Sequence, residues 1–316
     1  MEETKYDIIG DIHGYAGLLT RLLMELGYRE KDGCFRQPDR KVIFLGDFID
    51  KGPAIRQTLK IVRPMVDAGS ALAVMGNHEY NAVAYHTLDD CGRYFREHSL
   101  KNVKQHEATL ESFANAEEEW AEYLRWFATL PLFLDFHNLR VVHACWEEQA
   151  IRDLGGNNRF DPTLLSLSGI KRDLRQEAVN TLLKGPEIGV PGGLEYDGRK
   201  EMRVKWWLND RPFTYRNVAL QVPFELPNHP ITQAETKKVC GYAPDAPPVF
   251  FGHYGFRKPA EPIAPNVACV DLGVIRLGPL CAYRWDGECQ IDHNKFVCIA
   301  AREGNTIVKQ DYDSSA

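Results

Sequence analysis

Three short apolar segments near the start of the chain are each followed by a glycine and a polar residue. This recurring pattern constrains the fold more than any other feature of the sequence. The segments are residues 6–9, 41–45 and 71–75, and the motifs that follow them are GDIHG (10–14), GDFIDKG (46–52) and GNHE (76–79). Apolar residues at helical spacing fill both intervals between the segments. The pattern predicts a parallel βαβαβ unit whose three polar loops meet at one edge of the sheet.

The remainder of the chain predicts helices, further strands and one irregular region. Aromatic residues set among acidic ones over 81–128 predict helices above the sheet, with the Glu117–Glu119 run on a solvated face. Strands are expected at 132–134, at 139–142 and repeatedly after 248. Glycine and proline punctuate 147–247, where a helix is predicted over 162–184. We therefore predict one α/β domain over 1–316, in which 147–247 is a cap or substrate-specificity region.

Charge and hydropathy exclude several classes of partner. The net charge of -6 and the pI near 6.0 argue against a surface built to bind nucleic acid or an anionic membrane. No apolar run approaches the roughly 18 residues of a membrane span. The N-terminal residues lead directly into a strand pattern without the apolar core of a signal peptide. These features predict a cytoplasmic protein.

The eight cysteines are scattered, and the sequence contains no CxxC pair. Several lie within apolar runs, as Cys298 does in Phe296–Ile299. This distribution favours buried, reduced thiols over a disulfide framework or a zinc cluster.

The polar residues that terminate the strands form a set of the kind that binds metals. Carboxylates, imidazoles and one amide suit Mn²⁺, Fe or Zn²⁺, and a shared carboxylate can bridge two such ions. Four of the ten histidines directly follow an apolar strand; the other six, including His106, are predicted to be surface or structural residues. The set consists of Asp11, His13, Asp47, Asp50, Asn77, His78, His143 and His253.

The order of these motifs resembles that of the PPP-type, calcineurin-like metallophosphoesterases. The superfamily includes serine/threonine protein phosphatases, dinucleoside tetraphosphatases and the phosphatase modules of polynucleotide kinase-phosphatases. The resemblance covers about residues 5–145 and 248–290. It implies a four-layer α/β/β/α sandwich and two divalent metal ions, with manganese expected first and iron or zinc as alternatives.

The resemblance also implies a role for each strand-end residue. Asp47 would bridge the two ions, and a hydroxide between them would attack phosphorus directly. His78, oriented by Asp50, would protonate the leaving group or stabilise its charge. The first ion would be held by Asp11 and His13, and the second by Asn77, His143 and His253.

Phosphate-binding residues are less clearly indicated. The family usually has arginine after the second aspartate of the GDFIDKG motif, where this chain has Lys51, which offers a point charge without the bidentate fork. A second phosphate-binding arginine is usual in the middle region. Arg203 is the first candidate and Arg257 the second. The pair Trp206–Trp207 could contact a ring-bearing substrate, although buried core residues are the favoured interpretation.

These observations predict a metal-dependent phosphoesterase. The expected substrate is a small phosphorylated molecule or nucleotide, including dinucleoside polyphosphates, because signatures of the phosphoprotein enzymes are not evident in the middle region. A serine/threonine protein phosphatase is the alternative. A metal-free binding module on the same scaffold is disfavoured by the intact ligand set, and a nucleic-acid end-processing phosphatase by the acidic charge.

Overall fold

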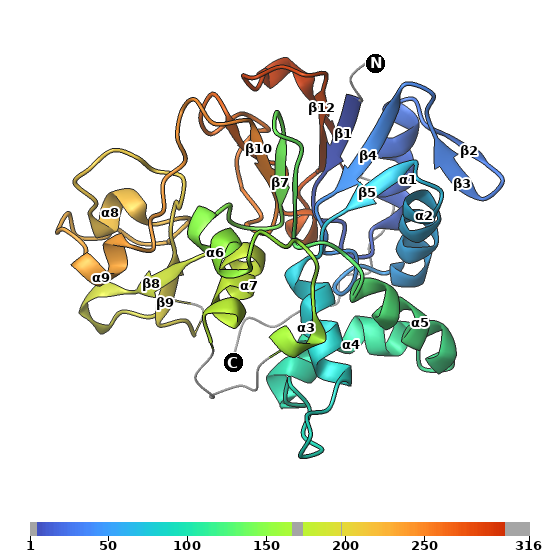
Figure 1. The fold of residues 1–316 in the computed structure, drawn as a ribbon, viewed down its shortest axis with the longest axis horizontal. Coiled ribbons are helices and arrows are strands. Elements are labelled where there is room, and N and C mark those ends of the chain that lie inside the picture. The colour runs from blue at the N-terminus through green and yellow to red at the C-terminus, as the bar shows by residue number, and fades with distance from the viewer. Residues whose placement is uncertain (1–4, 166–172, 197, 301–316) are drawn as a thin grey trace.

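The computed structural model describes residues 5–165, 173–196 and 198–300, and two β-sheets packed face to face form its centre (Figure 1). In the five-stranded sheet β1, β4 and β5 run parallel, as predicted, while β12 pairs antiparallel with β1 and β13 with β12. The strand order is β13-β12-β1-β4-β5. The strands are β1 (Lys5–Ile9), β4 (Arg40–Phe44), β5 (Ala71–Ala73), β12 (Leu280–Trp285) and β13 (Phe296–Ile299).

The second sheet has four strands in the order β11-β10-β7-β6. Its β7, β10 and β11 are parallel, and β6 forms an antiparallel pair with β7. The strands are β6 (Phe133–Asp135), β7 (Arg140–Val142), β10 (Val249–Phe251) and β11 (Val267–Cys269).

Alternation of side chains along the strands divides the core in two. Ile8 of β1 and Phe250 of β10 belong to the cluster between the sheets. Their neighbours Ile9 and Phe251 belong to the larger cluster on the outer faces. Because successive strand residues point to opposite faces, sheets covered on both sides need apolar residues at consecutive positions.

Helices cover the outer face of each sheet, which confirms the four-layer α/β/β/α architecture. The helices α1 (Ala16–Glu25) and α2 (Ile55–Asp67) pack on the first sheet, and α6 (Glu148–Asp153) and α7 (Leu174–Lys184) lie over the second (Figure 1). The helix predicted over 162–184 is a single 3₁₀ turn, η1 (Pro162–Leu164), followed by α7, and residues 166–172 of that prediction lie outside the described residues.

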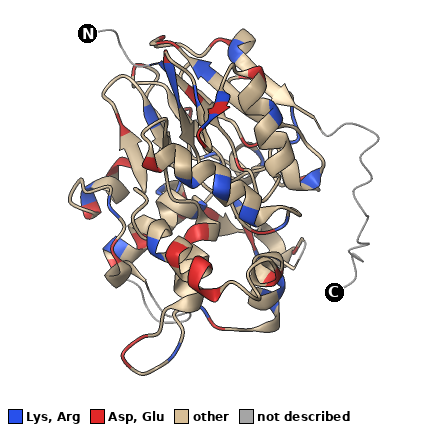
Figure 2. Ribbon diagram, turned by 90° about the vertical axis from the view of Figure 1, so that its right-hand side faces the viewer, with Lys and Arg blue, Asp and Glu red and all other residues tan. Residues whose placement is uncertain are grey.

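The predicted helical group over 81–128 consists of α3 (Asn77–His86), α4 (Leu100–Ser112) and α5 (Glu117–Phe127). The acidic start of α5 is a solvated face, as expected, and it lies beside basic residues of α2. Glu119 forms an ion pair with Arg56, and Glu122 lies 3.8 Å from Arg63. Figure 2 shows residues of both signs interspersed on this side of the molecule.

The middle region has a small hydrophobic core of its own around Ile188, Met202 and Val218. Trp206 and Trp207 are buried against Phe251 of β10 with ring centroids 5.1 and 5.5 Å away, so they are core residues. The single-domain organisation remains a prediction. The shorter elements are β2 (Arg29–Lys31), β3 (Cys34–Arg36), β8 (Glu187–Gly189), η2 (Pro191–Gly193), β9 (Glu201–Arg203), α8 (Tyr215–Val218), α9 (Gln233–Thr236), η3 (Val274–Arg276) and η4 (His293–Lys295).

The cysteines depart in part from the prediction of buried thiols. Cys281 and Cys298 are paired opposite each other on β12 and β13 and form a disulfide, so the expectation of reduced cysteines is wrong for this pair. The sequence shows the separation of two cysteines along the chain but not the strand register that makes them neighbours. Cys91 and Cys289 are exposed thiols. Across the described ranges, the structure contains no helix both long and apolar enough to cross a bilayer.

Candidate active site and metal centre

The loops that follow β1, β4 and β10 adopt a backbone conformation that is unusual for residues other than glycine. His13, Asp47 and His253 have φ of 46°, 51° and 70°, and both Asp50 and Lys51 have φ of 66°. These are five of the nine described non-glycine residues with positive φ. Left-handed conformations at such residues cost on the order of 1 kcal/mol or more each and concentrate at functional sites. The strain here coincides with the predicted site residues, three of them metal ligands.

Glycines let the second and third motif loops approach backbone to backbone. A Cβ on Gly46 would lie 2.4 Å from the Gly76 nitrogen, and one on Gly76 would lie 2.3 Å from Asp47 Oδ1. The fully buried Glu79 joins the two loops, since its carboxylate accepts hydrogen bonds from the backbone N–H of Asp47 (2.7 Å) and Phe48 (2.8 Å). This role of Glu79 was not predicted from the sequence, although its position at the end of the GNHE motif could have indicated it.

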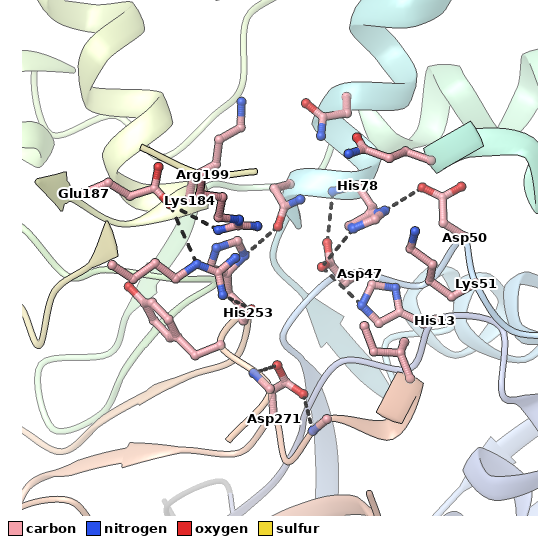
Figure 3. A pocket seen from close by; sticks show the side chains of 18 of the residues that line it. His13, Asp47, Asp50, Lys51, His78, Lys184, Glu187, Arg199, His253 and Asp271 are labelled. Carbon is pink, nitrogen blue, oxygen red and sulfur yellow. Dashed lines mark hydrogen bonds and ion pairs between the residues drawn. The ribbon is translucent and has the colours of Figure 1, made fainter. Parts of the chain in front are cut away.

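Predicted metal ligands lie on both sides of Asp47, and Figure 3 shows His13 on one side and His253 on the other. His13 Nε2 lies 3.6 Å from Asp47 Oδ2, and His143 Nε2 lies 3.5 Å from Oδ1. Asn77 Oδ1 is 3.0 Å from His143 Nε2 and 2.6 Å from His253 Nδ1. Asp47 thus stands between two groups of donor atoms, one on each side of its carboxylate.

Backbone carbonyls orient two of the imidazoles. His13 Nδ1 donates to the Ile49 carbonyl at 2.9 Å, and His143 Nδ1 donates to the Leu45 carbonyl at 2.6 Å. In a neutral ring this leaves Nε2 as the unprotonated nitrogen, directed towards Asp47, the arrangement typical of metal-binding histidines. Burial opposes protonation of His143, but the charge of Asp47 outweighs it and raises the pKa of this imidazole. Burial, followed by the nearby charge of Arg203, lowers the pKa of His253 and keeps its imidazole in the neutral form that binds metals.

Asp11 provides a test of whether this site suits divalent metal ions. Its side chain is 2% exposed, and among the described residues its Oδ1 has no hydrogen-bond donor. Burial, with the charges of Asp271 and Asp47, raises the pKa of the Asp11 carboxyl well above its usual range. Buried carboxylates so close together are costly unless cations compensate them. The residues present therefore fit a pair of divalent cations.

His78 is oriented by Asp50, as predicted for an acid or charge stabiliser. Its Nδ1 donates to Asp50 Oδ2 at 2.5 Å, and its Nε2 faces the centre, 3.9 Å from Asp47 Oδ2. Burial opposes protonation of His78, but the charges of Asp47 and Asp50 outweigh it and raise the pKa to about 9. These two carboxylates therefore favour the protonated imidazole.

A second histidine, His106 of α4, also contacts Asp50, and sequence reasoning missed it. His106 is 3% exposed, and its Nδ1 lies 2.9 Å from Asp50 Oδ1, which also accepts a 2.5 Å hydrogen bond from the Thr109 hydroxyl. Burial favours the neutral carboxyl, but the hydrogen bonds from His106 and His78 hold the pKa of Asp50 well below its usual value. His106 lies 56 residues after Asp50, and no local motif marks it.

We expect His106→Leu to lower kcat about tenfold with little change in KM, because Asp50 would lose a donor that orients it towards His78. His106→Asn keeps a donor near the Nδ1 position and should recover most of the rate. Steady-state kinetics of both variants measure this, with the exposed His293→Asn as control and thermal melting to verify folding. Equal losses in the leucine and asparagine variants would argue that His106 only fills space.

The site opens into a pocket of about 860 Å³, within the range of small-molecule sites. Of the three residues predicted to bind phosphate, Lys51 and Arg203 line the pocket, whereas Arg257 is exposed and is not among the lining residues. Arg96, from the segment between α3 and α4, also lines the pocket and was not predicted. The middle region supplies the opposite wall through Lys184, Arg199 and Arg203.

Comparison with known proteins identifies the family. The sequence model of one protein family, the calcineurin-like phosphoesterases, matches residues 4–222 of this chain. The chain belongs to this family. Membership confirms the resemblance read from the motifs and the enzyme class, phosphoesterase, that the motifs predicted.

Curated relatives in this family are bis(5'-nucleosyl)-tetraphosphatases PrpE [asymmetrical]. The protein from Geobacillus sp. (strain WCH70) is 34% identical over 149 residues, which cover 44% of this chain and 56% of the relative. That from Halalkalibacterium halodurans is 33% identical over 162 residues, covering 48% and 61%. The chain thus spans little more than half the length of these relatives.

Solved structures share the fold at low identity. A protein serine/threonine phosphatase from Saccharomyces cerevisiae with similarity to human phosphatase PP5 aligns with a TM-score of 0.52 and 14% identity. The alignment covers 97% of this chain and 83% of that one. At this identity the likeness supports the fold alone.

Proposed function

We propose that this protein is a phosphoesterase that depends on two divalent metal ions and cleaves phosphate esters or anhydrides by direct attack of water. The observation that carries the proposal is the convergence of buried donor atoms on both sides of Asp47, beside the Asp50–His78 pair. When bound, the ions would acidify the attacking water and compensate negative charge on the phosphate.

The protein side chains divide the remaining work. When the ions are bound, one would be held by Asp11 and His13 and the other by Asn77, His143 and His253. Asp47 lies between these two groups and would be shared by them. His78 holds its proton at Nε2, directed at the centre, and delivers it to the leaving oxygen. Lys51 and Arg203 bind the phosphate from opposite walls of the pocket. Arg257, the second candidate, is not among the residues that line it.

The substrate we favour is a small phosphorylated molecule or nucleotide, first of all a dinucleoside polyphosphate. The similar curated proteins are named as tetraphosphatases of this kind. The pocket also supports this choice, because the middle region forms one wall and a volume of about 860 Å³ accommodates a nucleotide. A serine/threonine protein phosphatase is the alternative.

We expect purified protein with added Mn²⁺ to hydrolyse a generic aryl phosphate and to lose that activity to a chelator. A phosphate-release screen across dinucleoside polyphosphates, mononucleotides and phosphopeptides then ranks the substrates by kcat/KM, and parallel assays with Fe and Zn²⁺ compare the metals. Preference for phosphopeptides would favour the alternative. Metal-loaded protein without turnover on any phosphoester would contradict the enzyme reading.

A further inference from the structure

Arg203, which we assign to the attacked phosphate, is not the only arginine among the described residues that line the pocket. Arg203 lies at the end of β9 and Arg199 just before this strand, whereas Arg276 comes from the η3 turn after β11. Arg257, in the loop after β10, lies close enough for its charge to act on Arg276. Segments far apart in the sequence thus bring guanidinium groups to one place.

The negative charge on this wall does not balance these arginines. Glu187 Oε1 is shared, since it lies 3.6 Å from Arg199 Nη1 and 3.9 Å from Arg203 Nε. Within the described part of the chain, Arg276 has no carboxylate within ion-pair distance. Partial burial of its side chain and then the charges of Arg257 and Arg203 lower the pKa of Arg276, against the opposing charge of Asp271. In a chain of net charge -6, such a concentration of positive charge indicates a site for an anion.

Two further acidic residues line the pocket, and the charge of one of them, Asp271, offsets part of the positive charge around Arg276. Glu201 is exposed at the start of β9. Asp271 is 6% exposed, and its carboxylate accepts hydrogen bonds from the backbone N–H groups of Gly273 (2.9 Å) and Gly255. Asp271 thereby ties the loop that carries His253 to the turn that carries Arg276.

The arginines lead from the metal centre towards solvent. Arg203 Nη1 lies 3.4 Å from the His253 carbonyl, and its Nε is buried without a hydrogen-bond partner among the described residues. The exposed fraction of the side chain is 24% for Arg203 and 48% for Arg199, and Arg276 is also exposed. Figure 3 shows Arg199 on the His253 side of the centre and Lys51 on the opposite side.

A single phosphate at the centre would leave the outer arginines without a ligand. Lys51 and Arg203 are assigned to the group under attack, whereas Arg199 and Arg276 line the pocket at more exposed positions. Guanidinium groups bind phosphate oxygens through paired, charge-assisted hydrogen bonds. Outer arginines beside a phosphate site therefore suit a substrate whose negative charge continues past the reacting phosphorus.

We propose that Arg199 and Arg276 form a subsite for phosphates beyond the one attacked, so that the preferred substrate is a linear phosphoanhydride chain rather than a single phosphate ester. This inference rests on the proposed function. Water oxygen forms the new bond to the attacked phosphorus, and the bond from that phosphorus to its bridging oxygen breaks. His78 gives its proton to the released phosphate chain, and the proton lost by the water restores the protonated imidazole.

The test compares the wild type with Arg199→Gln, Arg276→Gln and the double variant. Each is assayed with a dinucleoside tetraphosphate and with an aryl monophosphate in Mn²⁺. We expect each substitution to lower kcat/KM for the tetraphosphate about tenfold more than for the monophosphate. The exposed Arg152→Gln on α6 removes one positive charge elsewhere and serves as the matched control.

Binding of inorganic tripolyphosphate, measured by calorimetry, provides a readout independent of turnover. We expect the double variant to bind it at least tenfold more weakly than the wild type. Equal losses with both substrates, or unchanged tripolyphosphate affinity, would overturn the subsite. A wild type that binds tripolyphosphate through these arginines but hydrolyses no phosphoester would refute the proposed function while retaining the anion site.

Discussion

Replacing Asp47 by asparagine is expected to strip metal from the protein and to lower kcat/KM for phosphoester hydrolysis by roughly 10³-fold. The two carboxylate oxygens face different donors, since Oδ1 lies 3.5 Å from His143 Nε2 and Oδ2 lies 3.6 Å from His13 Nε2. Asparagine keeps one oxygen and loses the negative charge. It therefore cannot serve both groups of ligands, although its side-chain oxygen can still accept the hydrogen bond from the His78 backbone N–H.

Elemental analysis of metal per chain and steady-state kinetics measure the effect of Asp47→Asn. Asp39→Asn, at an exposed position before β4, is the matched control and should retain metal and rate. Thermal melting distinguishes loss of metal from loss of fold. If Asp47→Asn kept the wild-type metal content and rate, Asp47 would not be the shared ligand.

The second large effect is expected at His78, where His78→Asn should lower kcat about 10²- to 10³-fold while metals stay bound. The proton on Nε2 assists departure of the leaving oxygen, and Asp50 holds the ring in place through Nδ1 at 2.5 Å. The loss should therefore be large for an alkyl phosphate, whose leaving group is strongly basic. It should be much smaller for a nitrophenyl phosphate, whose leaving group departs without a proton.

The leaving-group comparison separates proton donation from other roles of His78. Metal content per chain is measured in parallel, and His293→Asn is the control for loss of an exposed imidazole. Equal losses with both substrates would assign His78 to substrate binding or metal retention. An unchanged kcat would remove it from the mechanism.

The alternating strand and helix pattern of the first 80 residues was predictable because its signals are local. Apolar runs, helical spacing and terminal glycines act within a few residues of one another, and parallel strands bring their ends to one edge. The predicted ligands from Asp11 to Asn77 are therefore close together in the structure. His143 and His253 joined this prediction only because each follows an apolar segment too, at the ends of β7 and β10.

Contacts between distant segments had no such signal. Cys281 and Cys298 meet through the register of β12 and β13, which follows from how that pair packs beside β1. The structure of the cap region could not be predicted from the sequence either. Its short strands and turns pack on a separate small core and on the buried Trp206 and Trp207, and no local pattern marks these contacts.

The positions of the three polar motifs in the fold thus followed from the sequence itself. Each follows a buried strand, and the glycine turn at the strand's end places its polar residues at one edge of the sheet. Tertiary structure alone decided what surrounds them. Burial of α4 sets His106 against Asp50, and the β9 and η3 segments direct Arg199 and Arg276 to one wall. Such neighbours depend on long-range packing of side chains, which no spacing within a motif encodes.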